Sequence, residues 1–271
     1  MDTENALTVV WKEQDLADLA AAVRRLENPG LVARLSDLVG TPIEAALRAL
    51  PAGAGEVISR AVHGSMRSAL DVAVRTMDPS RRRRPRFGGH ALAVGLAGGL
   101  GGAFGLPALA VELPITTTII LRSIADIARS QGEDLADPAA RLACLEVFAM
   151  GGPSPEDDAS ESGYFAVRTA LAQAVSEAAK YVAGKAVVED GAPVIVRLLA
   201  QIAARFNAVV GEKIVAQGVP LVGAVGGATV NLLFIDHFQS VARGHFTVRR
   251  LERRYGEAVV RERYREIASS L

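Results

Sequence analysis

The sequence is poor in cysteine, in aromatic residues and in net charge, and each shortage excludes a class of protein. Its one cysteine, Cys144, excludes a disulfide framework and a zinc site built from cysteines. Thirty Lys and Arg balance thirty Asp and Glu, so no overall field attracts nucleic acid. Aromatic residues make up 5% of the chain, whereas half of its residues are hydrophobic. This composition is typical of packed helices and excludes a disordered chain.

The sequence motifs of common enzymes are also missing. There is no P-loop, no H-E-x-x-H zinc motif and no G-x-S-x-G nucleophile motif. The glycines around Gly99 follow no predicted strand, so they do not indicate a dinucleotide site. His237 and His245 share a predicted helix, but eight residues separate them, which is too far for both to bind one ion. We therefore predict neither a metal nor a cofactor.

Hydrophobic residues spaced three and four apart predict helices along nearly the whole chain. Thr41-Pro42-Ile43-Glu44 has the form of a capping box with proline at the first helical position. Another helix is predicted from Asp137-Pro138 to Gly151-Gly152, and no stretch alternates as a strand does. Further helices are predicted over residues 13–27, 56–77, 114–131, 164–189, 193–215 and 229–255, with a surface loop over 153–162. The predicted fold class is all-α, as a single multi-helix domain.

The sequence contains two long runs without a charged residue, Ala91–Val111 and Ile214–Ile235. Each is long enough to cross a bilayer, and each contains glycines four residues apart, which let another helix approach closely. We expect the two runs to pack together at the centre of the domain. The alternative is that both are inserted in lipid. The predicted organisation is an N-terminal helical region over 1–80, an arginine-rich linker over 81–90 and a glycine-rich core with a basic C-terminal helix over 91–271.

Basic residues flank the two uncharged runs. Five arginines lie within residues 81–86, four residues before the first run, and others follow the second run. Cations beside apolar segments suit the anionic cytoplasmic leaflet of a membrane. No aromatic residues alternate with these arginines, so we expect no nucleic-acid partner. The predicted lipid-facing basic patch consists of Arg81, Arg82, Arg83, Arg84, Arg86, Arg250, Arg253 and Arg254.

A few polar residues stand in apolar surroundings. Glu112 lies between Val111 and Leu113, and a buried carboxylate needs a partner because an isolated charge is costly to desolvate. We expect an arginine such as Arg122 or Arg243 as this partner. If Arg249 on the final helix is buried, it needs an acidic partner, and Glu112 is the best candidate for that. We expect Asn231 to donate a hydrogen bond between helices. The predicted polar network consists of Glu112, Arg122, Asn231, Asp236, His237, Arg243, His245 and Arg249.

Several stretches of the sequence resemble the EcsC protein family. They are Leu113–Arg129 with Gly132–Leu135, Leu145–Gly152, Val219–Ala228, and Asp236–Gln239 through Arg243–Phe246 to Arg249–Glu252. They follow one another over roughly residues 40–256, and the start of the chain around Trp11 is similar too. The resemblance implies a bacterial helical protein with one family domain over about residues 11–256, and it supplies no catalytic residues. Because the namesake is encoded with the components of an ABC transporter, it also implies such components as candidate partners.

Two classes of function follow. The first is a noncatalytic, membrane-associated protein that binds lipid or a membrane partner. Since the first residues are acidic and polar and carry no signal peptide, we expect it at the inner face of the cell membrane. The second is a membrane-proximal hydrolase using Glu112 with Asp236 and His237 or His245, which requires these side chains to meet in one pocket. A further alternative is an integral membrane protein in which both uncharged runs span the bilayer.

Overall fold

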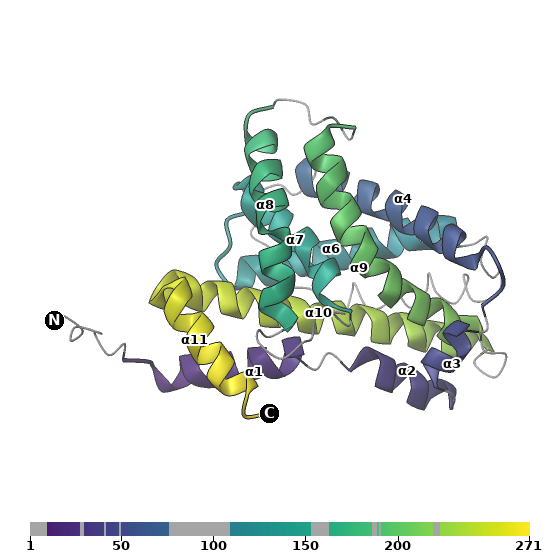
Figure 1. Ribbon diagram of the computed structural model, residues 1–271, viewed down its shortest axis with the longest axis horizontal. Coiled ribbons are helices and arrows are strands. Elements are labelled where there is room, and N and C mark those ends of the chain that lie inside the picture. The colour runs from purple at the N-terminus through teal and green to yellow at the C-terminus, as the bar shows by residue number, and fades with distance from the viewer. Residues whose placement is uncertain are drawn as a thin grey trace.

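One long helix, α10 (Gly223–Tyr255), forms the axis of the computed structural model (Figure 1). The structure describes residues 10–27, 30–40, 42–48, 50–75, 109–152, 163–185, 189, 191–218 and 223–271. Within these ranges every regular element is a helix, and the helices share one hydrophobic core. The predicted all-α, single-domain fold is confirmed. The other helices are α1 (Glu13–Glu27), α2 (Leu31–Val39), α3 (Ile43–Arg48), α4 (Ala54–Arg75), α6 (Leu109–Ser130), α7 (Pro138–Met150), α8 (Gly163–Ala183), α9 (Pro193–Gly218) and α11 (Glu257–Ala268).

Local sequence signals explain several helix ends. Helix α1 has the predicted bounds. Helix α7 begins after Asp137, whose side chain accepts a hydrogen bond from the backbone N–H of Ala139, and Pro138 occupies the first helical position. Gly132 follows α6 with a φ of 83°, a left-handed conformation that glycine adopts without strain. These caps fix the loop between α6 and α7, which matters below because it borders a cleft.

Other elements differ from the prediction. Helix α6 begins at Leu109, five residues before Pro114, so this proline lies inside the helix and cannot donate a hydrogen bond to the carbonyl of Ala110 in the first turn. Helix α8 ends at Ala183 rather than at Glu189. Helices α2 and α11 were not predicted. Both are short and begin directly after a glycine with positive φ.

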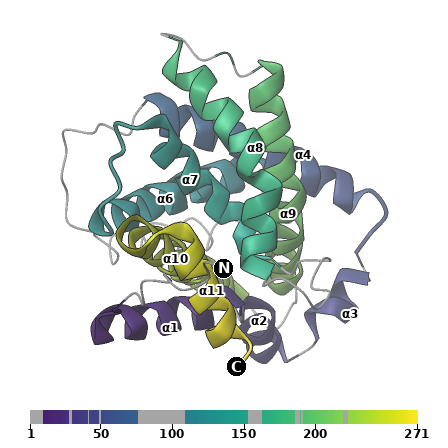
Figure 2. The ribbon, with the colours of Figure 1, turned by 60° about the vertical axis from the view of Figure 1, so that its left-hand side comes forward.

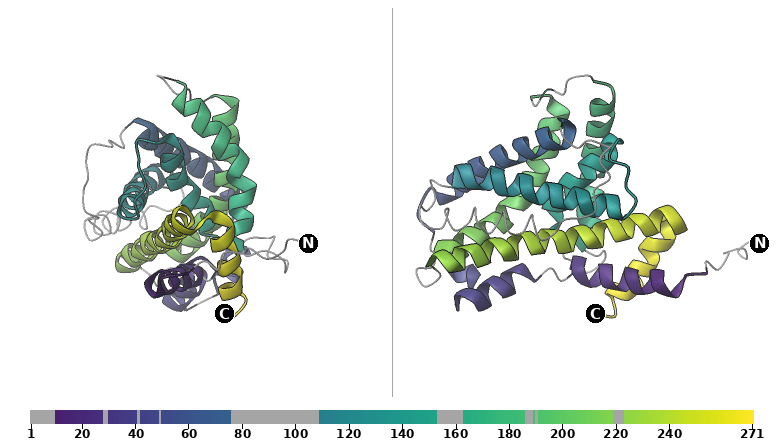
Figure 3. Two further views of the ribbon diagram at one scale, coloured as in Figure 1. Left: turned by 90° about the vertical axis from the view of Figure 1, so that its left-hand side faces the viewer. Right: turned by 180° about the vertical axis from the view of Figure 1, so that it is seen from behind.

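Helix α10 lies between two groups of helices. In Figure 2 it is seen nearly end-on, with α6 and α7 on one side and α1 on the other. Figure 3 shows α6 and α10 side by side. Three contacts join α10 to α6 and the loop after it, and they follow the same order along both segments, so the two helices run in the same direction. Glu112 bonds Asn231, Ser123 bonds Gln239, and Glu133 bonds Arg249. Helices α7 and α9 also pack against α10. In the right-hand view of Figure 3, α9 passes behind α6 and α10, so that view looks onto a face that α6 and α10 form together, called the open face below.

Helix α10 buries one broad face. Asn231, Phe234, Phe238, Val241 and His245 recur at spacings of three and four residues, which places them on one side of the helix, and all five are buried. Phe234 and Phe238 both pack against Phe206 of α9, and Phe238 also packs against Phe148 of α7, with the rings tilted or edge to face. Such a cluster of aromatic rings fixes the relative positions of three helices. Only the last residue of the face, Arg249, is partly exposed.

Only part of the two uncharged runs lies within the described residues. The second run, Ile214–Ile235, is divided between the end of α9 and the start of α10, so it does not form one spanning helix. The first run lies outside the described residues except for its last three, which open α6. The predicted packing of the two glycine-rich runs, the arginine-rich linker and the loop over 153–162 also lie outside the described residues. Among the described helices, one, over Pro193–Gln217 of α9, is long and apolar enough to cross a membrane, and half of its apolar window is buried.

Candidate functional site

A buried ion pair joins three helices near the start of α10. Lys213 Nζ on α9 lies 2.8 Å from Glu112 Oε1 on α6, and the same oxygen accepts a hydrogen bond of 3.3 Å from Asn231 Nδ2 on α10. The Lys213 side chain is 0% exposed and that of Glu112 is 7% exposed. Asn231 therefore makes the predicted interhelical hydrogen bond.

The partner of Glu112 is a lysine, and the prediction of an arginine partner was wrong. The Lys213 ammonium also lies 5.0 Å from the centre of the Phe234 ring, within reach of a cation–π interaction. Burial lowers the pKa of Lys213 below its ordinary value, and the charge of Glu112 opposes this shift. Sequence reasoning missed Lys213, although it continues the apolar stripe of Phe206, Val209 and Val210 and so had to be buried.

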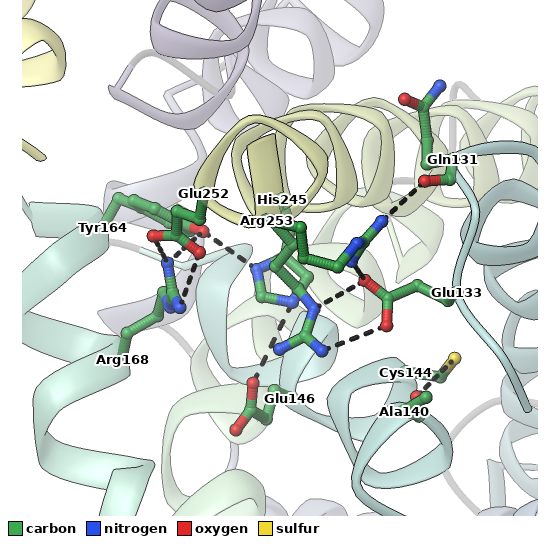
Figure 4. Close-up of polar contacts among 11 residues, drawn as sticks. Gln131, Glu133, Ala140, Cys144, Glu146, Tyr164, Arg168, His245, Glu252 and Arg253 are labelled. Atoms are coloured by element: carbon green, nitrogen blue, oxygen red, sulfur yellow. Dashed lines mark hydrogen bonds and ion pairs between the residues drawn. The ribbon is translucent and has the colours of Figure 1, made fainter. Parts of the chain in front are cut away.

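A second polar network lies near the other end of α10 (Figure 4). His245 Nδ1 is 3.0 Å from the hydroxyl of Tyr164 on α8, and His245 Nε2 is 3.9 Å from Glu146 Oε2 on α7. Arg168 donates to the Tyr164 hydroxyl at 3.2 Å and binds both carboxylate oxygens of Glu252, at 2.6 and 3.2 Å. Helices α7, α8 and α10 are therefore held together by a chain of polar contacts. Glu146 stands out in the sequence as a charged residue among the apolar residues of α7, but the predicted polar network did not include it.

The loop after α6 supplies the acidic partner of Arg249. Glu133 accepts two hydrogen bonds from Arg249, at 2.9 and 3.0 Å, and it also pairs with Arg253. Arg253 donates a further bond of 2.7 Å to the carbonyl oxygen of Gln131. Burial alone would raise the pKa of Glu133, but the two arginines outweigh it and hold that pKa below its usual value. Glu133 therefore stays ionised between its two cations.

A cleft opens beside this network. It has a volume of about 480 Å³ and carries both acidic and basic groups on its walls. The loop before α7 forms one wall and the α10–α11 junction forms the other. The residues that line it are Gly132, Glu133, Asp134, Asp137, Ala140, Arg249, Glu252, Arg253 and Glu257.

The electrostatics of the second network favour neutral, unreactive side chains. Burial lowers the pKa of His245 well below its ordinary value, and Arg168 and Arg249 lower it further. Burial raises the pKa of Glu146, of the Tyr164 hydroxyl and of the Cys144 thiol. A buried thiol of this kind is not a nucleophile, because the thiolate is the reactive form. The groups that the network assembles therefore stabilise helix packing rather than supply an activated nucleophile.

The residues proposed for a hydrolase are not brought together. Asp236 is exposed and pairs with Arg34 at 2.7 Å, whereas His237 Nε2 bonds the carbonyl oxygen of Gly151 at 2.7 Å. His245 lies about 12 Å further along α10 than His237, at 1.5 Å per residue. Glu112 has contacts with neither histidine among the interactions of the described residues. Nor do three His, Cys, Asp or Glu side chains gather anywhere in the described ranges as a metal site would require.

The remaining predicted residues have ordinary surroundings. Arg122 is exposed, and Arg243, partly exposed, donates to Gln239 at 3.4 Å. The three C-terminal arginines of the predicted basic patch all form ion pairs: Arg250 with Asp18 at 2.6 Å, Arg254 with Asp15 at 3.1 Å and Arg253 with Glu133. Acidic residues therefore offset much of the C-terminal basic charge, and the five arginines of the patch within 81–86 lie outside the described residues.

Comparison with known proteins identifies one family. The model of the EcsC protein family matches residues 10–251. The chain belongs to the EcsC protein family. No curated protein and no solved structure matches it. The EcsC match covers α1 to most of α10, so the buried pair of Lys213 and Glu112 lies inside it, whereas Glu252 and Arg253 at the end of α10 and all of α11 lie beyond it.

Proposed function

We propose that this EcsC-family protein is a noncatalytic, membrane-associated protein that binds an anionic membrane surface or a membrane partner, with ABC transporter components as candidate partners. The observation that carries the proposal is a group of three exposed apolar side chains close to the uncharged runs; Val10, Leu38, Val196 and Leu271 are also exposed but lie elsewhere in the chain. Val111 and Ile115 at the start of α6 are 68% and 50% exposed, and Leu232 near the start of α10 is 42% exposed. The three residues lie at one end of the molecule.

This end is also where the uncharged runs join the described helices. Helix α6 begins there directly after residues 91–108, and α9 ends and α10 begins there on either side of residues 219–222. The contacts of Glu112 with Lys213 and Asn231 bring these three helix ends together. Exposed apolar groups gathered beside uncharged sequence are typical of a surface that meets a membrane or a partner.

The charge pattern supports an anionic membrane. Five arginines lie within residues 81–86, and each is worth about 1 kcal/mol beside an anionic lipid surface. Because Arg250, Arg253 and Arg254 are engaged with acidic side chains, the run at 81–86 is expected to dominate the attraction.

Vesicle flotation tests the proposal. The protein should float with vesicles containing phosphatidylglycerol, should bind phosphatidylcholine vesicles weakly, and should lose binding as salt increases. Replacing Arg81–Arg84 with serine should weaken the binding and flatten its salt dependence. A matched variant with serine at Arg24, Arg60, Arg67 and Arg197 removes the same charge elsewhere and should bind more tightly than the first. If the wild-type protein floats with neither vesicle in low salt, the proposal is wrong.

A further inference from the structure

The open face formed by α6 and α10 repeats one pattern on both helices. On α6, the exposed residues Val111 and Ile115 are followed by Arg122, eleven residues after Val111. On α10, exposed Leu232 is followed by Arg243, again eleven residues later. Eleven residues are close to three full turns, so each arginine lies on the same side of its helix as the apolar residue before it. The two helices therefore carry parallel stripes that change from apolar to basic.

The two stripes are aligned because the helices are parallel. Glu112 lies level with Asn231, and Ser123 lies level with Gln239. By this register Arg122 and Arg243 lie within about two turns of each other along the bundle. On α10, Gln239 lies on the same side as Leu232 and Arg243 and donates a hydrogen bond to Ser123 of α6, so the stripe on α10 borders α6.

The spacing fits the interface of a lipid bilayer. Ile115 precedes Arg122 by about 10 Å along α6. With α6 steeply inclined to the membrane and its start inserted, Ile115 lies about 10 Å deeper than Arg122, and the long arginine side chain extends to the headgroups. The face also has an excess of positive charge, because Asp236 is paired with Arg34 and Asp126 with Arg129, while Arg122 has no acidic partner within the described residues.

We infer that this face docks on an anionic phospholipid bilayer with the starts of α6 and α10 inserted. Val111, Ile115 and Leu232 lie among the upper acyl chains, and Arg122, with Arg243 beside it, contacts the phosphate groups of the lipids. The inference rests on the proposed membrane association and adds to it the face, the depth and the headgroup contact.

Labelled single-cysteine variants test the orientation. Ile115→Cys and Val196→Cys are a matched pair, since the native side chains are 50% and 46% exposed and Val196 lies on the far half of α9. The native Cys144 is buried and does not compete for the label. An environment-sensitive fluorophore at position 115 should shift to the blue when phosphatidylglycerol vesicles are added, and spin-labelled lipids should quench it. The label at position 196 should do neither.

Arg122→Gln tests the headgroup contact. Its control is Arg197→Gln, which also removes one positive charge but does so on α9. Arg122→Gln should weaken binding to phosphatidylglycerol vesicles about fivefold, whereas Arg197→Gln should leave it within a factor of two. Circular dichroism and the melting temperature check that both variants fold. If the wild-type protein binds vesicles but the label at 196 is the one that is buried, or Arg197→Gln has the larger effect, this inference fails while membrane association stands. If the wild-type protein binds no vesicle, both fail.

Discussion

Lys213 is a charged residue in the core of this protein, and its two partners explain why it is tolerated there. Its ammonium is completely buried, yet it has a carboxylate at 2.8 Å and an aromatic ring at 5.0 Å. Burying two charges costs several kcal/mol per ion, and their attraction offsets this cost only when both partners are present. The pair therefore specifies how α6, α9 and α10 meet more than it adds to stability.

Removing one member of this pair should be costly. We expect Glu112→Gln to lower the free energy of unfolding by about 3–5 kcal/mol, because Lys213 would remain charged in the core. The double variant Glu112→Leu with Lys213→Met should recover most of the loss. Urea denaturation measures both, and Glu177→Gln, which breaks the exposed pair with Arg197, is the control and should cost at most about 1 kcal/mol. A loss for Glu112→Gln no larger than this control would contradict the prediction.

His245 should make stability depend on acid pH. Its pKa in the folded protein is well below the ordinary 6.5, so below about pH 6.5 the unfolded chain binds a proton that the folded protein does not. Stability is therefore lost as the pH falls through this range. Glu146 acts in the opposite direction, because its raised pKa makes the folded protein lose stability as the pH rises above about 4.5.

The variant His245→Gln separates the two effects. It keeps a polar side chain near Tyr164 but removes the titration, so its stability relative to wild type should improve between pH 7.5 and pH 5. The largest possible gain is about 2 kcal/mol, at about 1.4 kcal/mol per proton and pH unit below pH 6.5. Urea unfolding at both pH values measures the change. His63→Gln, at an exposed site on α4, controls for the loss of a histidine. Equal changes with pH in wild type and His245→Gln would refute the assignment.

At the scale of elements, α10 depends on one glycine for its contact with α1. A Cβ atom at Gly244 would lie 2.7 Å from Leu26 Cγ and 3.2 Å from the carbonyl oxygen of Ala22. Both neighbours belong to α1, and one of them is backbone that cannot move alone. The small residue therefore sets the distance between two helices that are more than 200 residues apart in sequence.

Gly244→Ala should consequently destabilise the protein by about 1–3 kcal/mol through overpacking, despite the better helix propensity of alanine. Gly64→Ala is the matched change in the middle of α4, where a Cβ would meet nothing within 4 Å. It should instead stabilise the protein by up to about 1 kcal/mol. Thermal unfolding of the two variants gives the comparison, and a stabilised Gly244→Ala would show that α1 packs elsewhere.

Periodic and capping signals predicted most of the long helices, because these signals are local. The bounds of α1 and the start of α7 follow from residues within one turn of each end. Helices α2 and α11 were missed because each is too short for its hydrophobic period to be distinctive. The polar candidates Glu112 and Asn231 were correctly expected to be buried. Their partners were not all found, because the pairing of Lys213 with Glu112 or of Arg250 with Asp18 depends on tertiary structure.

For the whole molecule, the distribution of charge decides how strongly an anionic membrane surface would attract it. In the described part of the chain, the acidic residues of α1 and of the α6–α7 loop pair with the arginines at the end of α10. Arg122 has no acidic partner among the described residues, and we expect the five arginines within residues 81–86 to add to the attraction of an anionic surface. Attraction of this kind is electrostatic, and it decays within about 8 Å at physiological salt and within about 3 Å at 1 M salt.

Cell fractionation should show this dependence directly. We expect the protein in the membrane pellet at low ionic strength and in the supernatant after a wash with about 1 M salt or with alkaline carbonate, since both remove peripheral proteins by weakening charge contacts. Replacing Arg81–Arg84 with serine should move much of it to the supernatant even at low salt. Recovery of the wild-type protein in the soluble fraction at low salt would contradict membrane association. Resistance to carbonate would instead indicate a spanning segment, and α9, whose length and composition suffice to cross a bilayer, would be the first helix to test.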